Sequence, residues 1–383
     1  MDKPTVQDIF HRFYPAYLDQ YSPSPVQAKV AHNIMNCKTG AYGANVCVCE
    51  DCGFVQIHYN SCRNRCCPMC QAVPKEMWMD ARREDVLDAP YFHLVFTVPD
   101  ILNPVIYSNQ RLLYDALYHA ASSTISELTA DPKHLGAKVG YICILHTWGS
   151  EMNFHPHIHT ILLGGGLASN NQWKDNGENF FLPIRVISKM FRGKYLEELK
   201  RLWEEDKLVF HGTAEKFRNH YTFKELLDSC YGMDWIPHCK KTFNGAQTVI
   251  KYLGKYTHRI AVSNHRIVRM DDDTVTFLVK DYRNEGQWKE LTISGVEFVR
   301  RFLMHVPPRR FVRIRHYGLL CSRTKSQKLT LCRNLLGCKK YLSKLRDMEM
   351  PELLEHLYGI KVCVCKACGG HLGKPQMRMP LRC

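Results

Sequence analysis

The chain has 383 residues, and its 52 Lys and Arg exceed its 37 Asp and Glu by a formal net charge of +15. Hydrophobic residues make up 45% of the chain and charged residues 23%, which is the composition of a globular protein and excludes a disordered or fibrous one. No apolar run approaches the ~18 residues of a membrane span, and the N-terminal segment lacks the layout of a signal peptide. We therefore expect a soluble cytoplasmic protein of two or three domains, with no membrane among its partners.

The spacing of apolar residues and the turn signals predict both helices and strands. In chain order, we expect a helix at 78–88, a strand at 91–98, a helix at 103–128, strands at 139–147 and 155–163, the second ended by the glycines at 164–166, helices at 188–206 and 244–258, and short strands between 260 and 293. The two strands on either side of the turn at 148–154 should pair antiparallel. This order indicates an α+β fold in which helices flank a central antiparallel sheet.

Composition divides the chain into three predicted parts. Residues 1–88 contain a first cysteine cluster, residues 89–305 contain most of the predicted helices and strands, and residues 306–383 are basic and end in further cysteines. Between Arg300 and Arg346 there are fourteen Lys or Arg residues and no Asp or Glu. A surface of one charge sign is typical of proteins that bind a polyanion, whereas a merely solubilising face usually mixes both signs. We therefore predict that this region binds nucleic acid, through residues that include Arg309, Arg310, Arg313 and Arg315.

Eighteen cysteines are the second unusual feature, and eight of them lie between positions 37 and 70. Metal binding explains them better than disulfides in a cytoplasmic protein. Two Cys-x2-Cys pairs can each direct two thiolates at one tetrahedral ion, which predicts a zinc-ribbon site made of Cys49, Cys52, Cys67 and Cys70. The remaining cysteines of this cluster, Cys37, Cys47, Cys62 and Cys66, are either buried thiols or complete a second zinc site, for which Cys62 and Cys66 are the predicted ligands. The nearby Arg63 and Arg65 suggest that this module contacts nucleic acid.

The C-terminal cysteines contain one further pair, Cys365 and Cys368, which is followed by two glycines. This pattern predicts a second zinc knuckle, and a flexible tail with spare thiols is the alternative. The sequence leaves the other ligands of this knuckle open among His371, Cys383, Cys338, Cys332 and Cys321.

Two histidines, His157 and His159, stand two residues apart in a predicted strand and therefore point to the same face of the sheet. Such a pair can bind a divalent metal when a neighbouring strand supplies a third ligand. The preceding strand offers His146, which the hairpin should place on the same face. The alternative is that the three histidines only occupy a hydrated face of the sheet.

Two tyrosines, Tyr252 and Tyr256, stand one turn apart on a predicted helix, and Lys251, Lys255 and Arg259 add positive charge around them. Tyrosines at this spacing are also common in helix cores. Together with the histidine pair and the basic chain, however, they suggest one chemistry. A tyrosine phenolate attacks a DNA phosphodiester while a metal on the histidines polarises the phosphate oxygens.

These motifs resemble a known family. His157-Ile-His159 and Tyr252-x3-Tyr256 are similar to the signatures of two-tyrosine HUH transposases, bacterial insertion-sequence enzymes that move by a rolling-circle route. The resemblance covers residues 25–335 and departs from the family at Cys66, where a histidine is expected. Further similar stretches are Asn60–Arg65, Phe96–Pro99, Leu145–Trp148, Tyr252–Asn264 and Arg313–Gly318.

The resemblance implies an HUH endonuclease-like sheet that follows a zinc-binding domain in a nucleoid-associated DNA transposase. It implies cleavage and transfer of single-stranded DNA through a 5′-phosphotyrosine link. It also implies structural Zn2+, and a catalytic Mg2+ or Mn2+ on His157 and His159 with either His146 or Gln247 as third ligand. The implied partners are single-stranded or hairpin transposon ends, target DNA and a host helicase, since the chain has no P-loop. A replication initiator or relaxase-like nickase, and a non-catalytic zinc-dependent DNA-binding regulator, are the alternatives.

Overall fold

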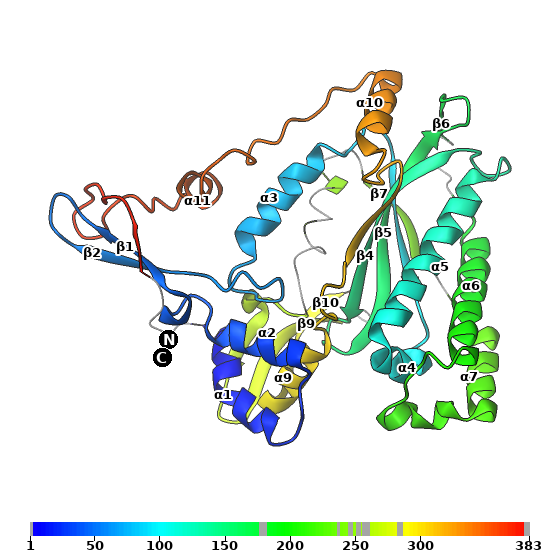
Figure 1. Ribbon diagram of the computed structural model, residues 1–383, viewed down its shortest axis with the longest axis horizontal. Helices are drawn as coiled ribbons and strands as arrows, with labels where there is room; N and C mark the ends of the chain where they lie inside the picture. The colour runs from blue at the N-terminus through cyan, green and yellow to red at the C-terminus, as the bar shows by residue number, and fades with distance from the viewer. Residues whose placement is uncertain are drawn as a thin grey trace.

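The structure is a computed structural model in which helices cover both faces of a central sheet (Figure 1). Within the described part of the chain, no helix is both long enough and apolar enough to cross a membrane. The structure describes residues 3–175, 182–235, 238–243, 248–249, 254, 261–281 and 286–378.

The central sheet is antiparallel throughout, with the strand order β11-β4-β5-β3-β7 and with β6 paired to the end of β5. This arrangement confirms the predicted α+β fold and the predicted pairing of the two strands around the turn. The strands of this sheet are β3 (Tyr91–Thr97), β4 (Lys138–Trp148), β5 (Phe154–Leu167), β6 (Trp173–Asp175), β7 (His238–Phe243) and β11 (Ile314–Gly318).

The three glycines expected to end the second strand instead lie within β5. Each is needed because a neighbour approaches its backbone closely. A Cβ on Gly164 would lie 2.7 Å from the Phe92 ring, and one on Gly166 would lie 2.4 Å from the carbonyl oxygen of Lys138. The glycines therefore allow the strand to continue past these contacts rather than stopping it.

One face of the sheet is covered by helices that form the largest hydrophobic core with it. The helix expected at 103–128 is two helices, because it breaks at Asn109. The Asn109 side chain donates to the backbone oxygen of Val209 at 2.7 Å and accepts from the Val209 N–H at 2.8 Å. These two bonds hold the loop that contains Val209. The helices of this layer are α4 (Asn103–Ser108), α5 (Gln110–Ala130), α6 (Ile184–Glu204) and α7 (His220–Gly232).

The opposite face of the sheet packs against α3 (Ala72–Arg83) and α10 (Lys325–Leu336). The helix expected at 78–88 therefore begins and ends earlier than predicted. Its Asp80 is buried and accepts hydrogen bonds from Tyr341 and Ser343 at 2.6 Å each, which fastens the segment after α10 to α3. Val249, one of the few described residues between 244 and 260, is buried in this same core.

A second lobe, which we call the N-terminal lobe, contains the N-terminal helices. The sequence analysis did not predict these helices. These helices share one hydrophobic core with residues 261–306, so residues on both sides of the proposed boundary at 88 pack together, and that boundary stays a prediction. The elements of this lobe are α1 (Val6–Leu18), α2 (Pro25–Met35), α9 (Gly295–Met304), β8 (Ile267–Met270), β9 (Thr274–Asp281) and β10 (Gln287–Ser294).

A small ribbon lobe lies beyond α3, at the far end of the molecule in Figure 1. Its sheet has the order β12-β1-β2, so a strand from the C-terminal end pairs with the N-terminal hairpin. The elements here are β1 (Ala44–Val48), β2 (Val55–Tyr59), α11 (Met350–Tyr358) and β12 (Gln376–Arg378), and short 3-10 helices elsewhere are Gly40–Tyr42, Asp100–Leu102, Gly212–Arg218 and Asn264–Arg266.

Gly318 ends β11, and we expect its replacement by alanine to destabilise the central sheet. Its φ is +61°, and an added Cβ would lie 1.8 Å from the carbonyl oxygen of Val139, so Gly318→Ala should cost roughly 2–4 kcal/mol in the free energy of unfolding. Gly193→Ala is the matched control, because Gly193 lies inside α6 with nothing within 4 Å of the added atom, and it should stabilise by about 0.5–1 kcal/mol. Urea unfolding midpoints measure both changes, and equal midpoints would contradict the observed register of β11.

Candidate functional site

The structure brings all three predicted histidines together on one face of the central sheet. In the β4–β5 ladder, His146 lies opposite His157. One ring nitrogen from each of His146, His157 and His159 falls within 4.8 Å of the others. The Nε2 atoms of His157 and His159 are 3.1 Å apart, and the three side chains are 4–8% exposed. The arrangement is a small, buried set of three imidazole donors.

Hydrogen bonds fix how these rings can present their nitrogens. His157 Nδ1 lies 2.7 Å from the backbone oxygen of His155. Because a carbonyl oxygen only accepts, this Nδ1 carries a proton and donates it, which leaves the Nε2 lone pair of neutral His157 directed at the cluster. Burial, with a smaller contribution from the positive charge of His155, lowers the pKa of His157 to about 4, so the ring is neutral at pH 7.

A fourth histidine, His93 on β3, supports the cluster from behind. Its Nε2 lies 2.9 Å from Nδ1 of His159, and the two rings are stacked. Two proton arrangements satisfy this contact. Either His159 donates from Nδ1 to His93 and keeps its Nε2 lone pair for a metal, or it accepts from His93 and donates from Nε2 to His157. Burial also lowers the pKa of His159. The sequence analysis missed His93, although its place in a predicted strand was a usable signal.

Trp148 and Arg313 pack beside the histidines. The Trp148 ring stacks on His146 with centroids 4.4 Å apart, and the Arg313 guanidinium carbon lies 5.6 Å from the Trp148 ring centroid. Arg313 is also close to Cys66, and its burial lowers the pKa of the guanidinium. Arg313, predicted as a DNA contact on a basic surface, therefore lies between the histidines and the N-terminal cysteines.

The other predicted DNA-contacting arginines have different environments. Arg315 forms an ion pair with Asp115 and stacks 4.0 Å from the Tyr118 ring centroid, and Arg65 donates to the backbone oxygen of Phe311 at 2.6 Å. Both arginines therefore have partners within the protein, and their role in DNA binding stays a prediction. Among the predicted arginines that the structure describes, Arg63, Arg65, Arg309 and Arg310 are exposed.

The acid-free stretch after position 300 passes through α9, β11 and α10. Acids outside the stretch pair with some of its basic side chains. Glu297 accepts from Arg300, for example, and Asp85 pairs with Lys325 at 2.8 Å. Part of the positive charge in the predicted nucleic-acid-binding region is therefore paired within the protein, and the extent of that region stays a prediction.

The two candidate tyrosines, Tyr252 and Tyr256, lie outside the described residues. The same is true of Lys251, Lys255, Arg259 and Gln247. Of the two candidates for the third metal ligand, the structure therefore describes only His146. Two described residues in this stretch do have contacts. Val249 packs in the core with Ile144 and Ile161, which belong to the strands that carry the histidines. A Cβ on Gly254 would meet Met79 of α3.

The first cysteine group consists of Cys37, Cys62, Cys67 and Cys70, whose sulfurs lie within 4.8 Å of one another. The expectation that the pairs 49/52 and 67/70 share one ion is therefore wrong. Cys37, at the end of α2, and Cys62 complete the 67/70 pair instead. Cys66, expected as a partner of Cys62, lies outside this group, and its burial raises the pKa of the thiol to about 11.

The second cysteine group joins the two ends of the chain. Cys49 and Cys52 lie beside Cys365 and Cys368, again with all four sulfurs within 4.8 Å of one another. The C-terminal pair thus takes the N-terminal pair as its partner, rather than any of the five candidates that the sequence offered. Of those candidates, Cys383 lies outside the described residues.

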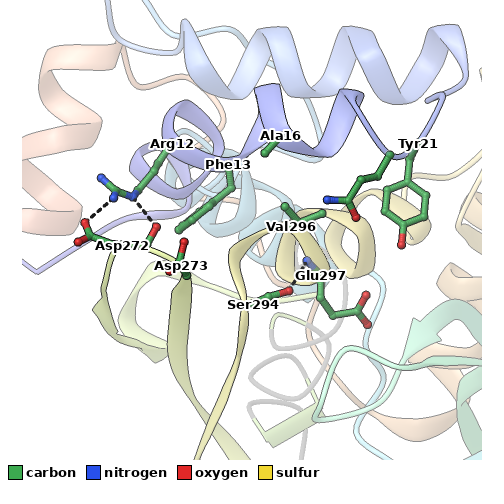
Figure 2. A pocket seen from close by; sticks show the side chains of 10 residues that line it. Arg12, Phe13, Ala16, Tyr21, Asp272, Asp273, Ser294, Val296 and Glu297 are labelled. Atoms are coloured by element: carbon green, nitrogen blue, oxygen red, sulfur yellow. Dashed lines mark hydrogen bonds and ion pairs between the residues drawn. The ribbon is translucent and has the colours of Figure 1, made fainter.

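A cavity of about 660 Å³ lies away from these groups, between α1 and α9 (Figure 2). Three of its charged side chains already have partners. Arg12 pairs with Asp272, and Glu297 accepts hydrogen bonds from Arg300 and Arg301, of which the bond from Arg300 contributes most to lowering the pKa of Glu297 to about 2. The cavity contains none of the three histidines or eight grouped cysteines, so we assign it no catalytic role.

Comparisons with known proteins agree with this geometry. A family model described as "Transposase zinc-binding domain" matches residues 9–98, which include the whole first cysteine group. A second model, described as "Putative transposase", matches residues 140–328, which include the three grouped histidines. No solved structure is similar enough to match. The zinc-binding match and the cysteine groups together support bound Zn2+.

Two relatives extend the similarity over most of the chain. "Putative transposase y4qJ" of Sinorhizobium fredii is 40% identical over 369 residues, which are 95% of this chain and 93% of the relative. "Transposase for insertion sequence element IS801" of Pseudomonas savastanoi pv. phaseolicola is 30% identical over 309 residues, or 79% of this chain and 72% of the relative. The prediction of a DNA transposase is confirmed: the chain belongs to the IS91 family of insertion-sequence transposases.

Proposed function

We propose that this transposase cleaves and rejoins single-stranded DNA at transposon ends through a metal-dependent tyrosine mechanism. The observation that carries the proposal is the convergence of His146, His157 and His159 within 4.8 Å on one sheet face. Buried polar groups are normally satisfied, and three imidazoles whose nitrogens lie this close together are well suited to share a divalent cation.

The donor set fits a metal that accepts nitrogen ligands. Mn2+ accepts imidazole more readily than Mg2+, which prefers oxygen ligands and retains its water, so we expect Mn2+ to support activity better. When bound, the metal supplies positive charge that stabilises the phosphate during cleavage. His93 serves this set as a positioning residue, because its hydrogen bond to Nδ1 of His159 orients the ring.

Tyr252 and Tyr256 are the proposed nucleophiles. Support for them comes from their spacing in the sequence and from the described residues beside them. Val249 lies against the strands that carry the histidines, and Gly254 lies against Met79 of α3, a helix that covers the same side of the sheet.

In the proposed reaction, a tyrosine phenolate oxygen attacks the scissile phosphorus and forms a phosphotyrosine bond to the 5′ end of the strand downstream of the cut. The bond from phosphorus to the 3′ oxygen breaks, and that oxygen takes up a proton to become a free 3′-OH. Attack of a 3′-OH on the phosphotyrosine reverses these steps and joins two strands. The bond energy is retained in the link, so joining needs no nucleotide cofactor.

The proposed DNA contacts are the exposed Arg63, Arg65, Arg309 and Arg310, and Lys251, Lys255 and Arg259, which neighbour the tyrosines in the sequence. Arg313 is a further candidate to bind a DNA phosphate. Its guanidinium lies over the Trp148 ring, which stacks on His146. Transposon ends, as single strands or hairpins, and target DNA are the proposed substrates. A host helicase or replication would supply the unwound strand.

The test is capture of the covalent adduct. The full chain is incubated with Mn2+ and a labelled single-stranded oligonucleotide that carries a transposon end, and adducts are separated by denaturing electrophoresis. We expect an adduct in the wild type that either Tyr252→Phe or Tyr256→Phe reduces and the double variant abolishes. Tyr221→Phe is the control, because this tyrosine is 76% exposed on α7. An adduct that persists in the double variant would show that another residue is the nucleophile.

A further inference from the structure

We propose that Cys49, Cys52, Cys365 and Cys368 bind a zinc ion of their own, and that this ion fastens the C-terminal segment to the N-terminal hairpin. We call this group the terminal clasp. The inference goes beyond DNA cleavage and does not depend on the proposed tyrosine mechanism. It assigns a metal site to a C-terminal segment that lies outside both matched family models, which end at residues 98 and 328.

The sulfur positions fit a tetrahedral zinc site. A Zn–S bond of about 2.3 Å places the sulfurs of such a site about 3.8 Å apart. In the clasp, Sγ of Cys49 lies 3.5 Å from Sγ of Cys368, and Sγ of Cys52 lies 3.7 Å from Sγ of Cys365. All four are free thiols at distances far longer than a disulfide bond.

Each half of the clasp has the same backbone turn. In the N-terminal half, the N–H of Gly53 donates to the carbonyl oxygen of Cys49 at 3.0 Å. In the C-terminal half, the N–H of Gly369 donates to that of Cys365, also at 3.0 Å. Both glycines have φ near +70°, which other residues rarely adopt. Backbone N–H groups also point at the C-terminal sulfurs, as expected for thiolates that bind a metal.

The backbones of the two halves are joined directly. The N–H of Glu50 donates to the carbonyl oxygen of His371 at 3.1 Å, and the N–H of Gly373 donates to that of Val48 at 2.9 Å. A Cβ on Gly370 would lie 1.8 Å from a carboxylate oxygen of Asp51, so the two turns approach as closely as glycine allows. The four cysteines are therefore assembled by specific pairing.

The ribbon lobe has too little core to hold this arrangement by hydrophobic burial alone. In the described residues, its buried cluster consists of Cys47, Cys49, Cys365 and Leu372. Two of these four are clasp cysteines themselves. Small modules with such a core usually need a metal or a disulfide, and binding of the metal is then coupled to folding. The clasp is the group in this lobe that can supply it.

Zinc content provides the first test. The full chain is purified without added chelator, and its zinc is measured by mass spectrometry. We expect the Cys365→Ala/Cys368→Ala variant to contain one zinc equivalent less than the wild type. Cys363→Ser is the matched control, because Cys363 is exposed, lies two residues from Cys365 and is outside the group. Equal zinc in the double variant and the wild type would overturn the proposal.

Cutting the chain tests the fastening itself. A protease site is inserted between Gly359 and Ile360, which are both exposed after α11, and the full chain is cleaved there. We expect the C-terminal fragment to stay with the body in gel filtration in the presence of zinc, and to separate from it after treatment with a zinc chelator. In the cut Cys365→Ala/Cys368→Ala variant, the fragment should separate even with zinc, while the first cysteine group remains intact. Retention of the fragment in that variant would overturn the fastening role.

Discussion

Replacing His157 by alanine is expected to lower covalent adduct formation with single-stranded DNA by roughly a thousandfold. The substitution removes an imidazole whose Nδ1 is held by the backbone oxygen of His155 and whose Nε2 faces the cluster. Charge stabilisation by a metal contributes several kcal/mol to such reactions, and about 4 kcal/mol corresponds to that factor in rate. Initial rates of adduct formation in saturating Mn2+ measure the effect.

Two further variants make the result specific. His155→Ala leaves the backbone oxygen that holds His157 in place and removes a side chain that bonds Asp100, so we expect near wild-type rates. His93→Phe retains the ring volume but removes the partner of His159, and should weaken Mn2+ affinity by 10–100-fold while excess Mn2+ restores the rate. If His155→Ala and His157→Ala reduced the rate equally, the cluster would not be the metal site.

Replacing Cys67 by alanine should unfold the N-terminal lobe. Cys67 is fully buried, belongs to the first cysteine group and packs in the core that α1, α2 and α9 share. A structural zinc contributes about 10–16 kcal/mol at pH 7, as much as the whole stability of a typical domain. We therefore expect Cys67→Ala to lose one zinc equivalent and to make residues 3–70 sensitive to limited proteolysis.

The control is a buried cysteine that belongs to no metal group. Cys230 on α7 is fully buried in the main core, and Cys230→Ala should cost only about 1–3 kcal/mol through the cavity left behind. Its zinc content and the protease resistance of the N-terminal lobe should stay at wild-type levels. A Cys67→Ala protein that retains its zinc and a resistant lobe would contradict the assignment of Cys67 as a ligand.

The central sheet was the most predictable part of the fold. Alternating and β-branched runs predicted β3, β4 and β5. The antiparallel pairing of β4 with β5 was also predicted, because the five-residue turn between them leaves these two strands few other partners. β11 was missed, since Arg315 and His316 make Ile314–Gly318 look like part of a basic surface. The helices α1 and α2 were overlooked despite capping boxes at Thr5–Asp8 and Ser24–Gln27 that the sequence displays.

The candidate site also has a part that the sequence predicted and a part that it did not. The histidines came together as predicted because the ladder itself aligns His146 with His157, a local consequence of the hairpin. The cysteine pairs did not, because every Cys-x2-Cys knuckle has the same local shape and nothing local selects its partner. Cys52 and Cys365 are 313 positions apart, and only the tertiary fold brings them together. His93 joined the site through the β3–β5 ladder, another contact between distant segments.

The terminal clasp also sets the order in which this protein can mature on the ribosome. Cys52 is synthesised 313 residues before Cys365, which at about 5–20 residues per second is an interval of roughly 15–60 s. During that time the N-terminal knuckle has two thiolates and no partner. A product that terminates before Cys368 can never close the clasp, so its ribbon lobe stays open to proteases. Completion of the clasp would therefore distinguish finished transposase molecules from truncated ones.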